Sequence, residues 1–138
     1  MHEKPILAVI DTNVIVSALL SHDGESNPSI VLKNVINGKI TPLFNDDIMS
    51  EYREVLSRDK FPFRHEDVEN TLDLFLKEGV KVDTTVSVNE TFIDMDDVVF
   101  YEVAMSMENA CLITGNIKHF PTNPIVITPA EMAALLKE

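Results

Sequence analysis

The sequence predicts an α/β fold built on a parallel β-sheet, and three observations lead to this fold class. Short apolar runs at residues 6–10, 111–114 and 125–127 are bounded by polar turns, which is typical of strands buried on both faces. Segments with helical spacing separate the runs, and such alternation favours right-handed crossovers between parallel strands. Asp11 directly follows the first run, so it should lie at the carboxyl edge of the sheet, where open α/β sheets bind ligands.

In the N-terminal half, capping residues and helix breakers set the bounds of the predicted elements. Thr12 or Asn13 can cap the helix that follows the first strand. Pro28 suits the first turn of the next helix, and Gly38 ends it. The Asn-Asp-Asp at residues 45–47 can cap a third helix. The elements expected here are a strand at 6–10, a short helix from the cap at 12 or 13 to about 20, a helix at 28–37, a strand at 42–44 and a helix at 48–58.

The C-terminal half continues the alternation of helices and strands. Gly79 ends a helix with apolar residues on one side. Apolar and polar residues alternate from 80 to 88, which predicts an edge strand or an extended connection. Thr128 and Pro129 open a terminal helix with Glu131 in its first turn. The elements expected here are helices at 66–77 and 94–107, strands at 111–114 and 125–127, and the helix after 128. No repeat or linker interrupts the pattern, so residues 1–138 are expected to form a single domain.

The composition is that of an ordinary globular protein. The 138 residues are 45% hydrophobic and 25% charged, which is enough to bury a sizeable core. No apolar run approaches the roughly 20 residues of a membrane helix, and no signal-peptide pattern opens the chain. The single cysteine, Cys111, excludes an internal disulfide framework, and its apolar neighbours favour a buried role over a nucleophilic one. We therefore expect a cytoplasmic location and no membrane partner.

The formal net charge of −12 limits the kinds of partner. A field of that sign repels polyanions and attracts cations, including metal ions and basic proteins. It argues against nucleic-acid binding through a broad basic surface. An enzyme that reaches phosphates through a bound divalent metal remains compatible with it.

Several acids fall on helix positions that face the core rather than solvent. Glu51 flanks the apolar stripe of its predicted helix, although a boundary glutamate turned to solvent fits the same pattern. Asp96 and Asp97 lie on the apolar side of a later helix. A cap or a helix-dipole partner explains one acid in a first turn, but with Asp94 there are three. A helix entering from the carboxyl edge would direct them toward Asp11.

An amide follows the next strand at the same edge. In Thr114-Gly115-Asn116, glycine permits a tight turn and Asn116 can cap the short helix after it. The same amide can instead help to hold a metal, its water ligand or a substrate. The sequence leaves both roles open.

Three carboxylates and an amide would form an all-oxygen pocket. Hard divalent cations such as Mg²⁺ or Mn²⁺ choose such ligands, and the absence of His and Cys from these positions disfavours zinc. Two ions roughly 3.5–4 Å apart can activate water and stabilise the leaving oxygen of a phosphodiester. Crowded carboxylates repel one another, so their pKa values should be raised when no metal is bound.

Four segments in this order resemble the PIN-domain family of metal-dependent ribonucleases. The matching segments are the strand-Asp-Thr-Asn opening at 6–13, Ser-Glu-Tyr-Arg-Glu-Val-Leu at 50–56, residues 94–104, and 110–120 with its Thr-Gly-Asn turn. Within the family, the chain is most similar to toxin components of bacterial and archaeal toxin–antitoxin pairs. The resemblance covers nearly the whole chain.

The resemblance implies the fold and the site residues. It implies a three-layer α/β/α fold with a central parallel sheet of four or five strands. It also implies that Asp11, Glu51 and Asp97 are the catalytic, metal-binding acids, with Asp94 and Asp96 as substitutes for Asp97. The family's fourth acid usually falls where this chain has Asn116, which should weaken a second metal site and leave one or two ions. Asn13 and Thr114 then correspond to positions that orient the acids.

The resemblance also implies partners. A single-stranded RNA substrate, a small antitoxin protein and a second copy of the chain in a homodimer are expected. Lys118 and His119 lie beside the expected pocket and can meet a phosphate, although exposed polar residues on a short helix fit equally well.

Other enzyme classes that share parts of this pattern are disfavoured. Haloacid-dehalogenase-like phosphatases place a second Asp two residues after the first, where this chain has Asn13. A response-regulator receiver should have paired acids at its first strand end and a Lys at the last. No glycine-rich phosphate loop and no nucleophile elbow follows a strand. The remaining alternative is a catalytically weak PIN-like binding or regulatory module, which Asn116 and the net acidity favour.

Overall fold

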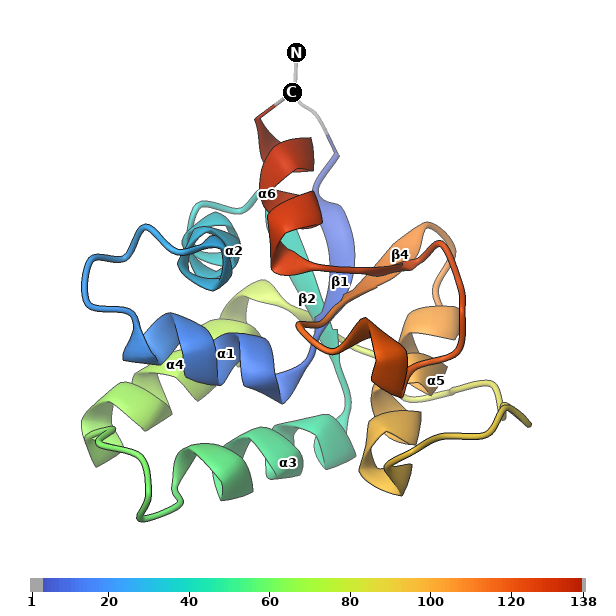
Figure 1. Cartoon of the computed structure of the whole chain (residues 1–138), viewed down its shortest axis with the longest axis horizontal. Coiled ribbons are helices and arrows are strands. Elements are labelled where there is room, and N and C mark those ends of the chain that lie inside the picture. The colour runs from blue at the N-terminus through green and yellow to red at the C-terminus, as the bar shows by residue number, and fades with distance from the viewer. Residues whose placement is uncertain (1–3, 138) are drawn as a thin grey trace.

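Five parallel strands form one sheet at the centre of the molecule (Figure 1). The computed structural model describes residues 4–137. Within that range the strand order is β3-β2-β1-β4-β5, and every neighbouring pair is parallel. The strands are β1 (Ile6–Ile10), β2 (Ile40–Phe44), β3 (Val80–Lys81), β4 (Ala110–Ile113) and β5 (Val126–Ile127). The predicted parallel α/β sheet is therefore confirmed.

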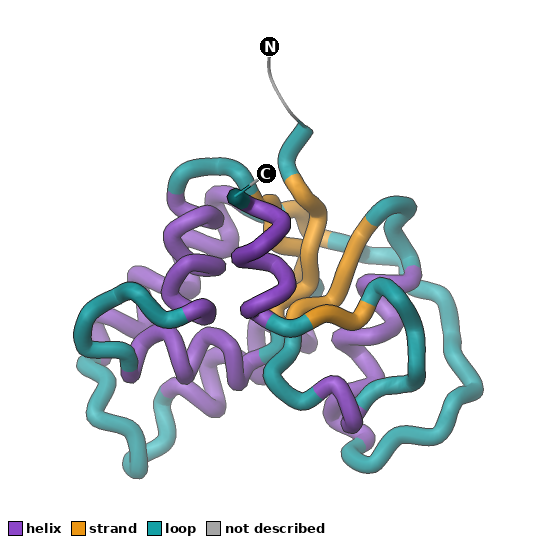
Figure 2. The backbone as a smooth tube through the Cα atoms, turned by 45° about the horizontal axis from the view of Figure 1, so that its top comes forward, coloured by secondary structure: helices purple, strands orange, loops and turns teal. Residues whose placement is uncertain are grey.

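Helices cover both faces of this sheet and complete three layers (Figures 1 and 2). They are α1 (Thr12–Leu20), α2 (Asn27–Ile36), α3 (Asp46–Leu56), α4 (His65–Glu78), α5 (Val98–Met105) and α6 (Pro129–Leu136), with 3₁₀-helices η1 (Met95–Asp97) and η2 (Ile117–His119). The chain moves across the sheet in one direction from β1 to β2 and in the other direction from β3 to β4. Right-handed connections therefore put α5 on the face of the sheet opposite α1 and α2. Accordingly, α5 contacts β1, β2 and β4, whereas α2 contacts α1, α4 and α6.

Five of the predicted helices lie within two residues of their expected bounds, and side-chain caps fix the amino ends of α2, α3 and α6. The Asn45 side chain accepts a hydrogen bond from the Ile48 amide at 2.9 Å. Thr128 and Glu131 form a reciprocal capping box at the start of α6. Among the described residues, no helix combines the length and the apolar character needed to cross a bilayer.

The central strand is fixed to the helix layer beneath its carboxyl end. Ala8, Val9 and Ile10 have no exposed surface, as the uninterrupted apolar run predicts. The buried Tyr52 hydroxyl on α3 donates a hydrogen bond to the Ile10 carbonyl. The Tyr52 ring packs edge-on against Phe75 on α4, with centroids 5.4 Å apart. The end of β1 is therefore held in place by α3.

The edge strand expected at residues 80–88 is much shorter than predicted. Only Val80 and Lys81 pair with β2, opposite Leu43 and Phe44. The strand ends there because β2 itself ends at Phe44 and the chain turns into α3, which leaves no parallel partner. Residues 82–88 continue as an extended connection, the other form that the alternation allowed.

The helix expected at residues 94–107 is divided into two parts. The Asp94 side chain accepts a hydrogen bond from the Asp96 amide at 2.9 Å and caps a 3₁₀ turn. The α-helix begins only at Val98. Asp96 and Asp97 therefore belong to a tight turn ahead of α5, and the helical spacing used to place them was wrong for these residues.

Gly79 occupies a site that a side chain would overfill. A Cβ there would lie 2.5 Å from the Pro42 carbonyl oxygen and 2.6 Å from that of Phe75. We expect Gly79→Ala to lower the free energy of unfolding by about 1–3 kcal/mol, as overpacking does. Chemical denaturation measures this change. Gly115→Ala is the matched control, because a Cβ at Gly115 meets nothing within 4 Å. Equal stability of the two variants would contradict the predicted clash.

Candidate metal-binding acidic site

The carboxyl edge of the sheet brings Asp11 beside the end of β4. The Asp11 amide donates to the Ile113 carbonyl at 2.9 Å, and the Thr114 amide donates to Ile127 at 2.9 Å. These backbone bonds extend the β1–β4 and β4–β5 registers by one residue. The residues that follow three neighbouring strands therefore converge at one edge, as the parallel topology predicts.

Thr114 holds the Asp11 carboxylate in a fixed orientation. Its hydroxyl donates to Asp11 Oδ2 at 2.7 Å and accepts a hydrogen bond from the backbone N–H of Asn116 at 3.0 Å. Thr114 has no exposed surface, and Asp11 is only 5% exposed. Burial raises the Asp11 pKa, while the Thr114 hydroxyl and nearby backbone amides partly oppose this change.

This orientation explains why the predicted cap of α1 was wrong. Asp11, rather than Thr12 or Asn13, occupies the N-cap position, and its side chain makes no capping hydrogen bond. The carboxylate turns instead to Thr114 across the sheet edge. Asp11 therefore does not stabilise its own helix through a side-chain cap, and its carboxylate is oriented by Thr114, 103 positions away in the sequence.

Asp97 contributes a second buried carboxylate, and one of its oxygens lacks a hydrogen-bond donor. Its side chain is 14% exposed, and Oδ2 is buried with no partner among the described residues. His119 Nδ1 lies 3.5 Å from this oxygen, within ion-pair range but without hydrogen-bond geometry. Burial, followed by the charges of Asp11 and Asp94, raises the Asp97 pKa to about 6. Such an atom is costly unless a cation or donor meets it.

Glu51 approaches the same edge from α3. Its carboxylate accepts a hydrogen bond from the Thr12 hydroxyl at 3.3 Å, and Thr12 directly follows Asp11. Burial and then the charge of Asp96 raise the Glu51 pKa. The charge of Asp96 therefore raises the Glu51 pKa, and the charge of Asp11 raises the Asp97 pKa. Tyr52, next to Glu51, is buried, as its place in the apolar stripe of this helix predicts. The contact of Thr12 with Glu51 was not predicted, because the sequence indicates only a capping role for Thr12.

The polar residues around these acids differ in how they meet the site. His119 faces Asp97, whereas Lys118 is exposed. Asn116 is also exposed, and its side chain makes no capping bond to η2. Asn13 and Asn116 line a common pocket of about 250 Å³ beside the edge. Asp94 is exposed and serves as the cap of η1.

The raised pKa values expected for crowded acids are present at Asp11, Glu51 and Asp97. Their main cause differs from the expectation, because burial comes first for each group and repulsion between carboxylates comes after it. The difference follows from the topology, which sinks the carboxylates into the sheet edge while their nearest charged neighbours remain partly solvated.

The donor set fits a hard divalent cation. Within residues 4–137, no three His, Cys, Asp or Glu side chains are already grouped closely enough to hold an ion. The unpartnered Oδ2 of Asp97 and the raised pKa values are nevertheless what a cation at this edge would relieve.

Comparison with known proteins adds one finding. Residues 7–118 match a family model described as PIN domain. No curated protein and no solved structure matches the chain. The matched range contains each acid discussed above as well as Asn116 and Thr114.

Proposed function

Because the chain belongs to the PIN-domain family, whose members are generally nucleases, we propose that it is a metal-dependent endoribonuclease acting on single-stranded RNA. The observation that carries this proposal is the buried Oδ2 of Asp97, which accepts no hydrogen bond from the described residues, meets His119 at ion-pair range and lies within the field of Asp11. A solvent-facing acid would need no counter-charge, but this oxygen does. Hydrolysis of phosphodiester bonds is the reaction that such a site supports best.

Asp11, Glu51 and Asp97 would hold Mg²⁺ or Mn²⁺, with the Asn116 amide as a neutral oxygen donor. When bound there, one or two divalent ions supply Lewis-acid polarisation of the phosphodiester and a lower pKa for an attacking water. Asn116 adds no charge, which favours one strongly held ion over two. Asp94 and Asp96 remain nearby acids that can substitute in part for Asp97.

The chain's own residues would fix these ligands before substrate arrives. Thr114 holds Asp11 through its hydroxyl, and Thr12 does the same for Glu51. Outer contacts of this kind orient ligating carboxylates and limit their rotation. His119, when protonated, would place a positive charge beside Asp97 and near an incoming phosphate, and exposed Lys118 would contact the same strand of RNA.

The biological setting follows from the family resemblance. We propose that the protein acts in the cytoplasm as the toxin of a toxin–antitoxin pair, as a homodimer that a small antitoxin protein inhibits. The net charge of −12 supports a basic segment in that antitoxin. Co-purification with the product of an adjacent small gene tests this assignment, and a monomeric chain without such a partner contradicts it.

We expect purified protein to cleave single-stranded RNA in the presence of Mg²⁺ or Mn²⁺, and we expect EDTA to stop this cleavage. Asp97→Asn should lower the rate about 100-fold, less than complete loss, because Asp94 and Asp96 stand beside it. Gel analysis of an end-labelled RNA measures the rate. Glu108→Gln, which changes an exposed acid at the amino end of β4, is the control and should be unchanged.

A wild-type rate equal to that of Asp97→Asn at excess metal would exclude this enzyme and favour a catalytically weak binding module. The exposed, unbonded Asn116 side chain is the observation that favours that second function.

A further inference from the structure

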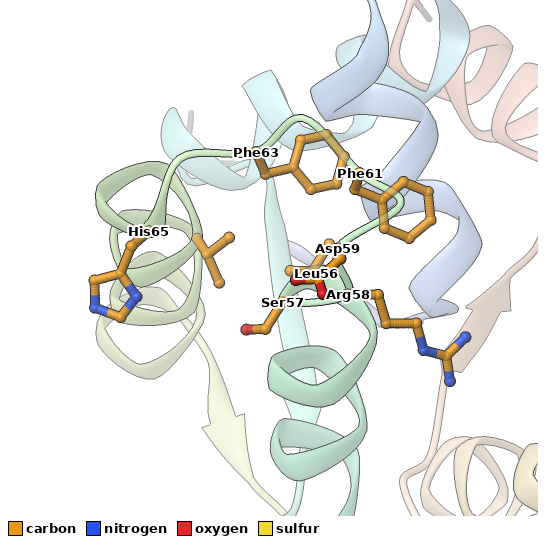
Figure 3. A pocket seen from close by; sticks show the side chains of 8 residues that line it. Leu56, Ser57, Arg58, Asp59, Phe61, Phe63 and His65 are labelled. Atoms are coloured by element: carbon orange, nitrogen blue, oxygen red, sulfur yellow. The ribbon is translucent and has the colours of Figure 1, made fainter.

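The loop between α3 and α4 lines a small pocket with an aromatic wall (Figure 3). The pocket has a volume of about 220 Å³, and Leu56 and Val68 contribute apolar surface to it. Phe61 and Phe63 lie side by side in Figure 3, and Arg58 and His65 extend on opposite sides of them. The volume is below the roughly 300–1,000 Å³ of sites for drug-sized ligands, so a single flat group suits it better than a larger cofactor.

The two phenylalanines form a stacked pair that the core does not fully enclose. Their ring centroids are 5.2 Å apart, and the ring planes differ by 13°. Both side chains are only partly buried. Lys60 Nζ lies 5.1 Å from the Phe61 centroid, so a cation already rests against this aromatic surface. Partly exposed aromatic side chains beside a cation form the kind of surface on which nucleobases stack.

The basic residues of the chain gather in this part of the sequence. Of the 11 Lys and Arg residues, four lie within residues 53–64, including every arginine. That stretch holds two acids, Glu54 and Asp59, and the acids that pair with Arg64 and Arg53 follow directly after it at Asp67 and Glu69. Such a patch is narrow rather than broad, and it complements the phosphates of one strand.

Arg58 connects this patch to the acidic edge. Arg58 lies in the loop just after α3, which ends at Leu56, and it donates to both oxygens of Glu54 in the last turn of that helix, at 3.2 and 2.8 Å. Hydrogen bonding to Glu54 raises the Arg58 pKa, and the charges of Glu51 and Asp96 add to this effect.

The ion pairs of the patch leave its cations accessible. The Arg58 and Glu54 side chains are 47% and 61% exposed, and exposed pairs of this kind are weak. Arg58 can therefore exchange Glu54 for a phosphate at little cost. Among the described residues, no ion pair involves Lys60.

We propose that Phe61 and Phe63 stack an unpaired base of single-stranded RNA while Lys60 and Arg58 bind its flanking phosphates. This inference rests on the proposed ribonuclease function and assigns it a substrate-positioning surface beside the acidic edge. Paired bases in a duplex have no free face for the rings, so the platform selects single strands. An apolar peptide would give Lys60 and Arg58 no anionic partner.

Binding without cleavage tests the platform. Fluorescence anisotropy is measured with a labelled 12-nucleotide single-stranded RNA of mixed sequence, in EDTA at low salt. We expect Phe61→Leu to weaken binding about 5-fold or more, from the lost stacking, and Phe61→Tyr to retain it. Lys60→Gln should reduce the slope of log affinity against log salt by about 0.7, the value for one phosphate.

The control variant Lys39→Gln removes an exposed lysine at the amino end of β2 and should leave the salt slope unchanged. Wild-type affinity in Phe61→Leu and Phe63→Leu together would overturn the platform and leave the pocket to a polypeptide. Absence of RNA binding by the wild type would overturn it as well. Because metal is absent, these results do not depend on whether the acidic edge cleaves RNA, and thermal unfolding of each variant excludes misfolding.

Discussion

Asp11→Asn is expected to lower RNA cleavage about 1,000-fold or more and, at the same time, to stabilise the metal-free protein. Loss of a carboxylate ligand removes several kcal/mol of transition-state stabilisation. Asp11 is the most buried of these acids, and no other carboxylate directly follows β1 to replace it. An asparagine has the same shape, and its carbonyl can accept the Thr114 hydrogen bond.

The stabilisation follows from the direction of the Asp11 pKa. Because burial raises that pKa, the folded protein binds the proton more tightly than the unfolded chain does. At pH 7 the ionised carboxylate therefore opposes folding, and a neutral amide removes the cost. Thermal unfolding in EDTA should give a higher Tm for Asp11→Asn than for the wild type.

A variant that lost both activity and stability would show that Asp11 supports the fold instead. Thr114→Val is the companion variant, because it removes the hydroxyl that orients Asp11 but leaves the charge. We expect it to lower cleavage about 10- to 100-fold, as loss of an outer-shell partner does. It should also raise the Asp11 pKa further, which NMR titration can measure.

The stability of the metal-free protein is expected to fall as the pH rises from about 4 to 7. The Asp97 pKa is about 6 in the folded protein against 3.8 for an unperturbed Asp, so the folded state holds the extra proton within that window. The free energy of unfolding therefore decreases with rising pH. The full shift corresponds to about 3 kcal/mol, and solvent screening reduces this to about 1–2 kcal/mol. Asp11 and Glu51 act in the same direction.

Divalent metal should reverse this dependence. Mg²⁺ binds the ionised carboxylates, so it competes with protons and stabilises the protein more at pH 7 than at pH 5. A concentration 100 times the dissociation constant adds about 2.7 kcal/mol at the favoured pH. Urea denaturation at several pH values, with EDTA and with Mg²⁺, measures both effects. Asp97→Asn should flatten the metal-free curve, and an unchanged slope in that variant would assign the effect to other groups.

Local patterns in the sequence were sufficient for most of the fold. The apolar run at β1 and the caps at Asn45 and Thr128 depend on residues within one turn or strand, and the elements formed where these signals predicted them. Residues 80–88 and 94–107 were less predictable. The first depends on where β2 ends, and the second on an Asp94 side chain that competes with the helix for the Asp96 amide.

The candidate site divides in the same way. The position of Asp11 at the sheet edge is predictable, because the residue that follows a buried parallel strand lies at the carboxyl edge of the sheet. Its partner Thr114 also follows a strand, so their proximity was predictable from the topology. The contact of His119 with Asp97 was not, because neither residue's rotamer is fixed by its neighbours in sequence.

The sequence by itself determined the elements of this protein, their parallel arrangement and the edge at which Asp11 lies. Hydrophobic periodicity and caps depend on residues that are close in sequence, and crossover handedness follows a general rule, so a single sequence is enough to infer them. Only the tertiary structure decided that Thr12 meets Glu51, that Asp97 keeps a buried oxygen without a donor, and that Phe61 and Phe63 stack beside Arg58. These contacts depend on packing between distant segments, which a local pattern does not encode.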